Sequence, residues 1–235
     1  MADIAQNVAA VRERIAAAAR RAGRDPGSIA LMAVTKTVEP RRIREAHAAG
    51  IRLFGENRVQ EFGEKINLLR DLEGSSFHLI GHLQTNKAAR AAEIFSAVDS
   101  LDSLRLAEKL NQAGAKLKRR LDVLIEVNVG GEAAKSGVPP DSAELEALLS
   151  AAARLESLRF SGLMTVPPFT ADPEQARPHF RRLRELRDAM ATRVPPGVQL
   201  RELSMGMSHD FEVAIEEGAT CVRVGTAIFG ARLQR

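Results

Sequence analysis

The sequence has no tyrosine, no tryptophan and a single cysteine among its 235 residues. That cysteine, Cys221, cannot form a disulfide within the chain, so we expect a reducing compartment, the cytoplasm. No apolar run is long enough to cross a bilayer, and we therefore expect no membrane-spanning segment. The alanine-rich start carries Asp3 and Glu13 where a secretory signal would need an apolar segment, so we expect no export.

An excess of one charge is also missing, because 34 lysines and arginines face 30 acidic residues, for a net charge of +4. The basic residues are spread along the chain, and their short runs at 116–120 and 181–187 are typical of solvated helix faces. Aromatic residues make up only 4% of the chain, and no basic block is interleaved with them. We therefore predict no nucleic-acid binding.

A linker rich in proline, glycine or serine is absent too, which favours a single domain over 1–235 rather than two small ones. Short apolar or alternating segments recur instead about every 25 residues, each followed by a helical segment. The expected strands cover 29–34, 51–54, 77–80, 95–98, 122–129, 158–164, 198–203 and 220–224. Eight such units predict a (β/α)8 TIM barrel of the α/β class. An open doubly wound sheet would need a glycine fingerprint after the first strand, and none is there.

One further helix is expected at 2–22, ahead of the first strand. Its apolar residues Ile4, Val8, Val11 and Ile15 fall on one face at helical spacing. Since eight strand–helix units close a barrel without it, we expect it to pack across the barrel as an extra N-terminal helix. The other expected helices cover 41–49, 58–72, 87–93, 103–114, 141–155, 172–191 and 209–217.

Lys36 follows the first expected strand directly. The stretch 29–34 is mostly apolar with β-branched residues at its ends, as in a buried parallel strand. Pro40 opens the next helix, so Lys36 falls on the face of the barrel where catalytic residues collect. A partly desolvated lysine amine at such a place can become a nucleophile toward an aldehyde. On this stretch alone, a solvated loop lysine is the alternative interpretation.

The loops expected after strands seven and eight suit a phosphate, which this fold usually binds there. The segment 204–208 offers hydroxyls, a flexible glycine and the start of a helix, whose free N–H groups favour an anion. The methionines of this segment fit packing or a soft lining of a ligand site equally well. Either loop alone is compatible with ordinary turn chemistry. The residues expected at the phosphate are Ser204, Met205, Gly206, Gly225 and Thr226.

Arg223, near the end of the last strand, lies between the phosphate loops and the barrel interior. A buried cation needs a partner, and the ring nitrogen of a pyridine is one candidate. A lysine on strand one, a phosphate clamp on strands seven and eight and this arginine together suggest pyridoxal 5′-phosphate (PLP). Lys36 would then form an aldimine with its aldehyde.

Seven segments of the chain carry a resemblance to a known family. They are 33–37 (AVTKT), 54–61 (FGENRVQE), 78–87 (HLIGHLQTNK), 135–137 (KSG), 162–165 (GLMT), 203–208 (LSMGMS) and 222–230 (VRVGTAIFG). In these segments the sequence resembles the pyridoxal phosphate homeostasis protein family. Arg58, where the family often has tyrosine, and Phe77, where tryptophan is common, depart from the pattern beside the motif cores.

The resemblance implies a barrel like the N-terminal domain of alanine racemase and a protein that binds, buffers and delivers PLP. It implies that Lys36 is the aldimine lysine and that Arg223 faces the pyridine nitrogen. It also implies a protein that is mainly monomeric. Apo PLP-dependent enzymes are expected as transient partners of such a carrier. The further residues that the resemblance places at the cofactor are Asn57, Met164, Ser204, Gly225 and Thr226.

Whether the protein is an enzyme or a carrier is the main question of function. A racemase of this fold needs a second acid–base group, which in alanine racemase, as the resemblance implies, is a tyrosine from an added domain. This chain has no tyrosine, and an arginine at the pyridine nitrogen weakens the ring as an electron sink. We therefore predict a non-catalytic PLP carrier. A weak PLP-dependent racemase or other fold-type III enzyme, and a phosphate-binding barrel without an aldimine, are the alternatives.

Metal and thiol chemistry are not expected. His78 and His82 are four residues apart, but on a strand end they would not face the same point. Cys221 falls within an expected strand rather than in an electropositive loop, so we do not expect a nucleophile there.

Overall fold

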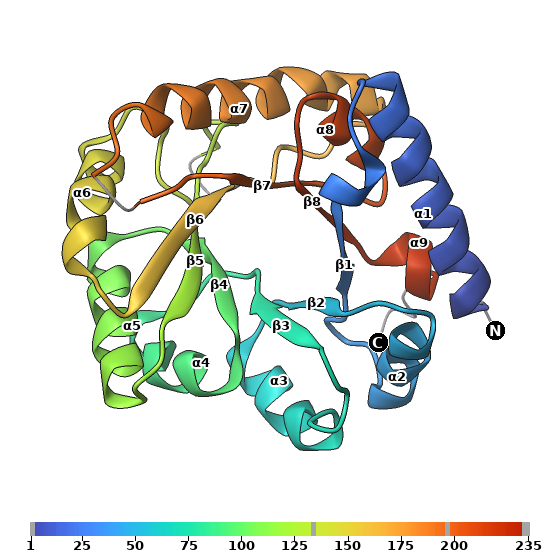
Figure 1. Cartoon of the computed structure of the whole chain (residues 1–235), viewed down its shortest axis with the longest axis horizontal. Helices are drawn as coiled ribbons and strands as arrows, with labels where there is room; N and C mark the ends of the chain where they lie inside the picture. The colour runs from blue at the N-terminus through green and yellow to red at the C-terminus, as the bar shows by residue number, and fades with distance from the viewer. Residues whose placement is uncertain (1–2, 133–134, 196–197, 232–235) are drawn as a thin grey trace.

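The computed structural model describes residues 3–132, 135–195 and 198–231. The strands found in this part of the chain are β1 (Ala30–Val34), β2 (Leu53–Glu56), β3 (Ser76–Leu79), β4 (Ala97–Leu101), β5 (Leu121–Glu126), β6 (Leu158–Met164), β7 (Glu202–Met207) and β8 (Cys221–Val224). They pair in parallel in chain order, and β8 pairs with β1 to close the barrel (Figure 1). The predicted (β/α)8 TIM barrel is confirmed.

Helices surround the barrel on its outside. They are α1 (Ile4–Arg21), α2 (Pro40–Ala48), α3 (Val59–Lys65), α4 (Ala88–Ile94), α5 (Leu104–Lys116), α6 (Ala143–Ala151), α7 (Arg177–Ala191), α8 (Phe211–Glu216) and α9 (Thr226–Phe229). The 3-10 turns are η1 (Pro26–Ser28), η2 (Ile66–Leu68), η3 (Thr85–Lys87), η4 (Ala152–Arg154) and η5 (Pro173–Ala176). Across the described chain, no helix combines the length and the apolar character that spanning a bilayer requires.

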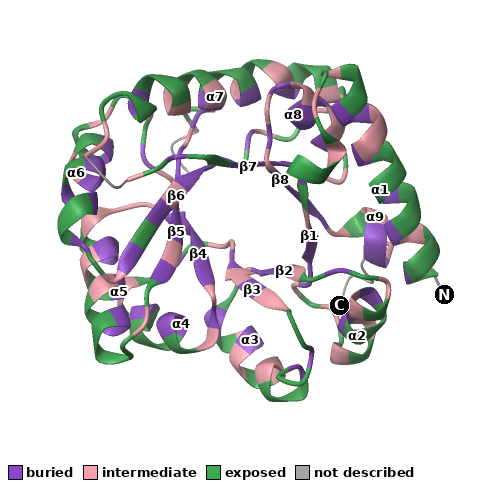
Figure 2. Cartoon of the chain, in the orientation of Figure 1, coloured by how far each residue is buried: buried purple, intermediate pink, exposed green. Residues whose placement is uncertain are grey.

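Each strand divides its side chains between the helices and the barrel interior, because successive side chains of a strand point to opposite faces. In β8, Val222 and Val224 join the large apolar core between strands and helices, whereas Cys221 and Arg223 face the interior. The strands are buried and the outer helix faces exposed (Figure 2). Burial on both faces explains why the strands are apolar runs.

The predicted extra helix α1 lies beside α8 and α9 (Figure 1). The Asn7 side-chain amide donates to the carbonyl of Ile228 at 2.9 Å, and Arg21 pairs with Glu216 at 2.9 Å. The first expected residue of this helix, Ala2, lies outside the described residues. Since β1 and β8 meet at this seam, α1 fastens the place where the barrel closes. Its buried residues are Ile4, Val8, Val11, Ile15, Ala18 and Ala19.

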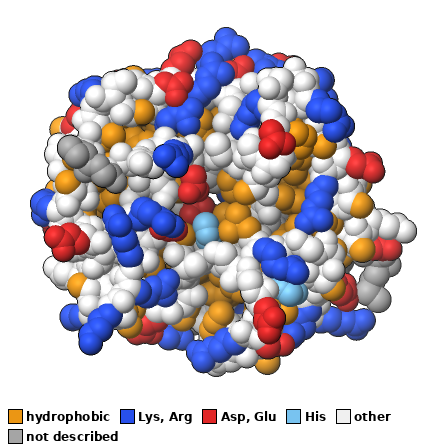
Figure 3. Space-filling view, viewed as in Figure 1, with side chains coloured by type: hydrophobic (Ala, Val, Ile, Leu, Met, Phe, Trp, Pro, Cys, Tyr) orange, Lys and Arg blue, Asp and Glu red, His pale blue; other side chains and the backbone are white. Residues whose placement is uncertain are grey.

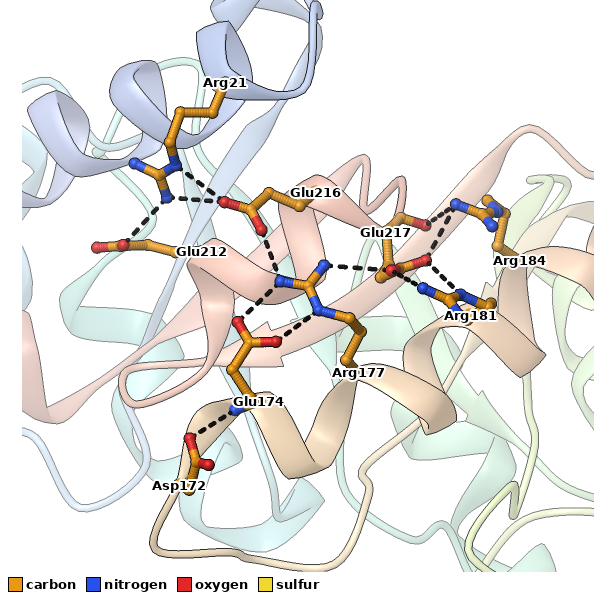
Figure 4. Close-up of polar contacts among 9 residues, drawn as sticks. All are labelled: Arg21, Asp172, Glu174, Arg177, Arg181, Arg184, Glu212, Glu216 and Glu217. Carbon is orange, nitrogen blue, oxygen red and sulfur yellow. Dashed lines mark hydrogen bonds and ion pairs between the residues drawn. The ribbon is translucent and has the colours of Figure 1, made fainter.

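A cluster of ion pairs joins α7 to α8 (Figure 4). Glu217, which is 4% exposed, pairs with Arg177, Arg181 and Arg184 at 3.2, 3.0 and 3.1 Å. Although burial disfavours its charge, the hydrogen bonds from the arginines hold the pKa of Glu217 below its ordinary value. The cluster fixes the C-terminal end of α8, the helix that follows β7.

The seventh strand differs from the sequence prediction, which placed it at 198–203. The strand is Glu202–Met207, so most of the segment expected to be a phosphate loop belongs to the sheet. The pairing of β7 with β8 shifts register between Ser204 and Met207. Gly206, with φ of 91°, lies in this bulge, and its left-handed conformation lets the strand continue past the irregularity.

Candidate functional site

The carboxyl ends of the eight strands meet at one mouth of the barrel, and most of the predicted site residues lie there. Lys36 follows the end of β1 by two residues, in a turn, and is half-buried. The next residue, Thr37, has φ of 62°. A β-branched residue rarely adopts this conformation, so surrounding contacts must hold the turn.

Lys65 supplies several of those contacts. Only 12% of its side chain is exposed, and its Nζ lies 3.2 Å from the carbonyl of Thr35 and 3.5 Å from that of Val38. It also pairs with Glu61 at 2.9 Å, and Glu61 accepts a hydrogen bond from the N–H of Thr37 at 2.7 Å. The turn that carries the predicted nucleophile is therefore tied at three backbone positions.

Glu56, the last residue of β2, completes this support. Its Oε1 accepts hydrogen bonds from Thr35 Oγ1 at 2.8 Å and from Lys65 Nζ at 3.0 Å. Its Oε2 is buried without a hydrogen-bond partner. Burial raises the pKa of Glu56, and the charge of Lys65 opposes that rise.

Arg223 lies inside the barrel on β8 and is 3% exposed. One terminal nitrogen donates to the carbonyl and the hydroxyl of Ser204 at 2.6 and 2.8 Å, and the other donates to the carbonyl of Thr165 at 2.7 Å. These three bonds do not use Nε. Burial lowers the pKa of Arg223, and no carboxylate in the described ranges forms an ion pair with it. The guanidinium is therefore oriented by neutral oxygens, with a donor left for a further acceptor.

The predicted phosphate residues Gly225 and Thr226 lie at the start of α9. Two backbone N–H groups, of Gly225 and Ala227, donate to the hydroxyl of Ser208 at 3.2 and 3.3 Å. Thr226 is exposed at the same place. Two N–H groups that converge on one oxygen suit an oxygen of a phosphate as well as a hydroxyl. Ser208 was not among the residues expected at the phosphate, although it is the second of the two serines in the segment 204–208.

The start of α8 was expected to offer free N–H groups to the phosphate. Asp210 precedes this helix, and within the described residues its side chain caps no N–H of α8 but accepts a hydrogen bond from the N–H of Met207 at 2.6 Å. A carboxylate at a helix N-terminus competes with any other anion. The contribution of this helix start stays a prediction, and the donors that converge on one oxygen are the N–H groups of Gly225 and Ala227.

The remaining predicted residues of β6 and β7 divide between the mouth and the core. Met164 pairs in register with Ser204, and both are buried. Met205 belongs to the apolar core between strands and helices, so its side chain packs and does not line the mouth. A Cβ at Gly206 would lie 2.6 Å from the Cβ of Ala214, so close packing of β7 on α8 also requires this glycine.

Asn57 follows β2 directly and is half-buried, as expected for a residue of the mouth. Its Oδ1 is fully buried without a hydrogen-bond partner. Buried amide oxygens are seldom left unsatisfied, so this atom indicates a ligand or a water at the mouth. The backbone at Gly81 packs so closely on Asn57 that a Cβ there would overlap the Asn57 carbonyl.

Glu126, the last residue of β5, was missed by the sequence analysis. It pairs in register with Met164, is 8% exposed, and its Oε2 has no hydrogen-bond partner. Burial, with the nearby Asp102, raises the pKa of Glu126 to about 7. Glu126 stands between Ile125 and Val127 in the expected strand 122–129, and a carboxylate between such apolar neighbours was the signal in the sequence that could have revealed it.

The opposite, N-terminal end of the barrel holds a second polar region. A cavity of about 380 Å³ lies there, and its lining includes His78, Asp99, Glu202 and Cys221. Acidic side chains and a histidine gather beside the central hollow (Figure 3). His78 Nδ1 lies 3.0 Å from Asp99 Oδ1, and burial raises the pKa of Cys221 to about 12. This thiol is therefore no nucleophile at neutral pH.

The two histidines with metal-like spacing bond to different carboxylates. His78 pairs with Asp99, while His82 pairs with Asp102 at 2.9 Å and is mostly exposed. Among the residues that the structure describes, no group of three or more potential ligands is arranged for a metal ion.

Comparison with known proteins decides the family. A profile described as "Alanine racemase, N-terminal domain" matches residues 6–233. The pyridoxal phosphate homeostasis protein of Aquifex aeolicus is 47% identical over 227 residues, 97% of each chain. That of Escherichia coli K12 is 45% identical over 237 residues, 99% of this chain and 98% of the other. The chain belongs to the pyridoxal phosphate homeostasis protein family. The resemblance seen in the sequence motifs is thus confirmed.

Solved structures similar to this chain agree with the barrel. PipY of Synechococcus elongatus PCC7942 without PLP is 38% identical, with a TM-score of 0.86 over 97% of this chain and all of that one. The same protein with PLP bound gives 0.84 at 37% identity, with the same coverage. Alanine racemase of Clostridium difficile 630 is 14% identical with a TM-score of 0.75, covering 99% of this chain and 57% of that one, which shows a shared fold alone.

Proposed function

We propose that this protein binds PLP in the mouth at the carboxyl ends of the strands, with the cofactor held as an aldimine by Lys36. We further propose that it stores and delivers PLP and does not catalyse a reaction on amino acids. When bound, PLP supplies an aldehyde that an amine can capture and a pyridine ring that can accept electrons. The observation that carries the proposal is Arg223, a buried cation whose hydrogen bonds within the described residues all go to neutral oxygens.

The donor set of the mouth fits PLP. A half-buried amine, Lys36, follows β1, and a buried cation, Arg223, lies on the neighbouring strand β8. The converging N–H groups at the start of α9 suit a phosphate. Two buried oxygens without hydrogen-bond partners, Asn57 Oδ1 and Glu126 Oε2, lie at the same end of the barrel. An occupied mouth would satisfy such atoms.

Each residue then has a physical role toward the cofactor. Lys36 provides the nucleophile, and the contacts of Lys65 hold its turn. The Ser204 hydroxyl and carbonyl hold the Arg223 guanidinium, which would face the ring nitrogen of bound PLP. The relatives named for PLP homeostasis and PipY with PLP bound support this assignment. The residues proposed to contact PLP are Lys36, Asn57, Met164, Ser204, Arg223, Gly225, Thr226 and, in addition, Ser208.

The proposal of a carrier follows from the charge at the ring. A cation such as Arg223 beside the pyridine nitrogen disfavours its protonation, which weakens the ring as an electron sink for carbanions. The chain also has no tyrosine to act as a second acid–base group. Homologues named as homeostasis proteins are consistent with this proposal.

One observation favours a second candidate, a weak PLP-dependent racemase or other fold-type III enzyme. In a closed barrel with strands in chain order, β5 lies opposite β1. Glu126, at the end of β5, is a buried carboxyl whose pKa near neutrality suits proton transfer. Loss of α-deuterium from L-alanine into water, measured by NMR with PLP-loaded protein, decides between the two. Exchange at about 1 s⁻¹ or faster, in the range of enzyme turnover, would refute the carrier.

The binding mode is tested by absorption spectra of the protein with PLP, before and after borohydride reduction. Lys36→Ala should abolish the visible band and the reducible adduct. Lys87→Ala is the matched control, because Lys87 is an exposed lysine at the same end of the barrel, and it should keep both. A normal, reducible band in Lys36→Ala would place the aldimine on another amine.

Beyond the binding site, we propose that the chain acts as a single-domain, mainly monomeric protein in the cytoplasm. Apo PLP-dependent enzymes would be its transient partners. Transfer of PLP from loaded protein to an apoenzyme, faster than from an equal concentration of free PLP, would support delivery. Equal rates would reduce the role to storage.

A further inference from the structure

Glu126 is the most unusual polar residue of the mouth, and the roles proposed above leave its raised pKa without a function. Its side chain faces the barrel interior, as does Leu124 two residues before it, which lines the internal cavity. Gly137 packs against this side chain, since a Cβ at Gly137 would lie only 3.1 Å from Glu126 Cγ, so the glycine leaves room for it. Oε2 is buried and has no hydrogen-bond partner among the described residues. A buried carboxyl with such an oxygen is poised to change its protonation state when its surroundings change.

The charges around Glu126 come from three other parts of the barrel. Asp102, which follows β4, disfavours its ionised form, whereas Arg223 on β8 and His82 after β3 favour it. Burial has the largest effect and, like Asp102, disfavours the ionised form of Glu126. The carboxyl therefore gains or loses its charge near neutral pH. Met164, its register partner on β6, is apolar and adds no charge.

A ligand in this mouth would shift Glu126 toward its protonated form. PLP brings a phosphate anion, and its ring displaces water from the barrel interior. Both effects disfavour a second negative charge nearby. A ring nitrogen that accepts a hydrogen bond from Arg223 would also weaken the attraction by which this cation favours the ionised form of Glu126.

We propose that Glu126 takes up a proton when PLP enters the mouth, so that loading consumes a proton and release becomes easier as the pH rises. This inference rests on the proposed function. It makes Glu126 a residue that couples the retention of PLP to pH, distinct from the groups that hold the phosphate and the aldehyde. At pH values between the pKa of Glu126 in the free protein and its pKa in the loaded protein, the affinity for PLP then falls by up to about tenfold for each unit of rising pH.

Calorimetric titration with PLP at pH 8, in two buffers of different ionisation enthalpy, counts the protons exchanged on binding. The comparison is between the wild-type protein and Glu126→Gln, which keeps the shape of the neutral acid. Protons exchanged by PLP itself and by Lys36 are common to both proteins and cancel. We expect wild type to take up roughly one proton more than the variant at pH 8, and a difference that vanishes at pH 5. Glu132→Gln, a half-buried glutamate in the loop after β5, should behave as wild type.

Two results separate this inference from the proposed function. Equal proton counts in wild type and Glu126→Gln, with PLP bound by both, would overturn the inference and leave the PLP site intact. Failure of the wild-type protein to bind PLP would overturn both. Should the variant fold poorly, the ¹³C carboxyl signal of Glu126 in the wild-type protein provides the same test. It must shift toward the protonated form when PLP is added at pH 8, and an unchanged signal refutes the inference.

Discussion

Replacing Lys65 by methionine should destabilise the protein strongly, and more at pH 8 than at pH 5. The substitution leaves Glu56, whose side chain is fully buried, without its ion-pair partner at 3.0 Å. Removing one partner of a buried pair costs about 3–5 kcal/mol. Two backbone carbonyls of the Lys36 turn, those of Thr35 and Val38, also lose a donor.

The pH dependence follows from the direction of the pKa shift. Burial already raises the pKa of Glu56, and Lys65 is the first of the opposing influences. Without Lys65 the folded-state pKa rises further above the unfolded value, so the folded state binds the proton more tightly. The part of the destabilisation that comes from Glu56 is therefore small while Glu56 is protonated in both states, and it grows as the pH rises through the unfolded pKa. The loss of the donor to the two carbonyls is the same at both pH values.

Urea denaturation of wild type, Lys65→Met and the double variant Lys65→Met/Glu56→Gln at both pH values tests the argument. The double variant should be more stable than Lys65→Met at pH 8, because the unpaired charge is gone. Lys109→Met, at an exposed lysine of α5, is the control and should change stability by less than about 0.5 kcal/mol. Equal losses at pH 5 and pH 8, or a double variant less stable than the single one, would refute the reasoning.

Two further predictions concern buried carboxyls. Glu126→Gln should stabilise the PLP-free protein by up to about 3 kcal/mol at pH 8 and change its stability little at pH 5. The reason is that the pKa of Glu126 is raised from 4.5 to about 7, so the free-energy cost of burying the carboxyl appears only when it ionises. Thermal unfolding at the two pH values checks this, and a variant no more stable than wild type at pH 8 contradicts it. Glu217→Gln should destabilise the protein by about 1–3 kcal/mol at pH 7, since Arg177 and two further arginines lose an ionised acceptor. The lowered pKa of Glu217 means that this stabilisation is lost as the pH falls through the folded-state value; a urea-measured loss that does not shrink in acid would argue against it.

The barrel could be predicted from the sequence because its signals are local. Apolar runs separated by helical periodicity identify a strand and its following helix without any knowledge of distant partners. The sixth strand was placed at 158–164, as found. The seventh was misplaced because the bulge at Gly206 depends on pairing with β8, which no local pattern reports.

Candidate site residues could be singled out from the sequence where chemistry coincides with the end of a strand. Lys36 and Arg223 were chosen because a charged residue at such a position is unusual in itself. Lys65 and Glu126 were missed, since their meaning depends on tertiary partners. Lys65 contacts the carbonyl of Thr35 across 30 positions of the chain, and the pKa of Glu126 is raised by burial and by Asp102, which is distant in the sequence.

The position of α1 has a consequence for the way the chain reaches its fold. Asn7 bonds to Ile228 across 221 positions, and Arg21 pairs with Glu216 across 195. Contacts between such distant residues are slow to form, because a long loop must close before they provide any stabilisation. During synthesis α1 can meet α2 early, but the part of its apolar face that packs on α8 and α9 remains without these partners until both helices have been made. Although α1 precedes the other described helices in the chain, it is among the last to find its place, and until then its exposed face is a site for chaperones or for aggregation.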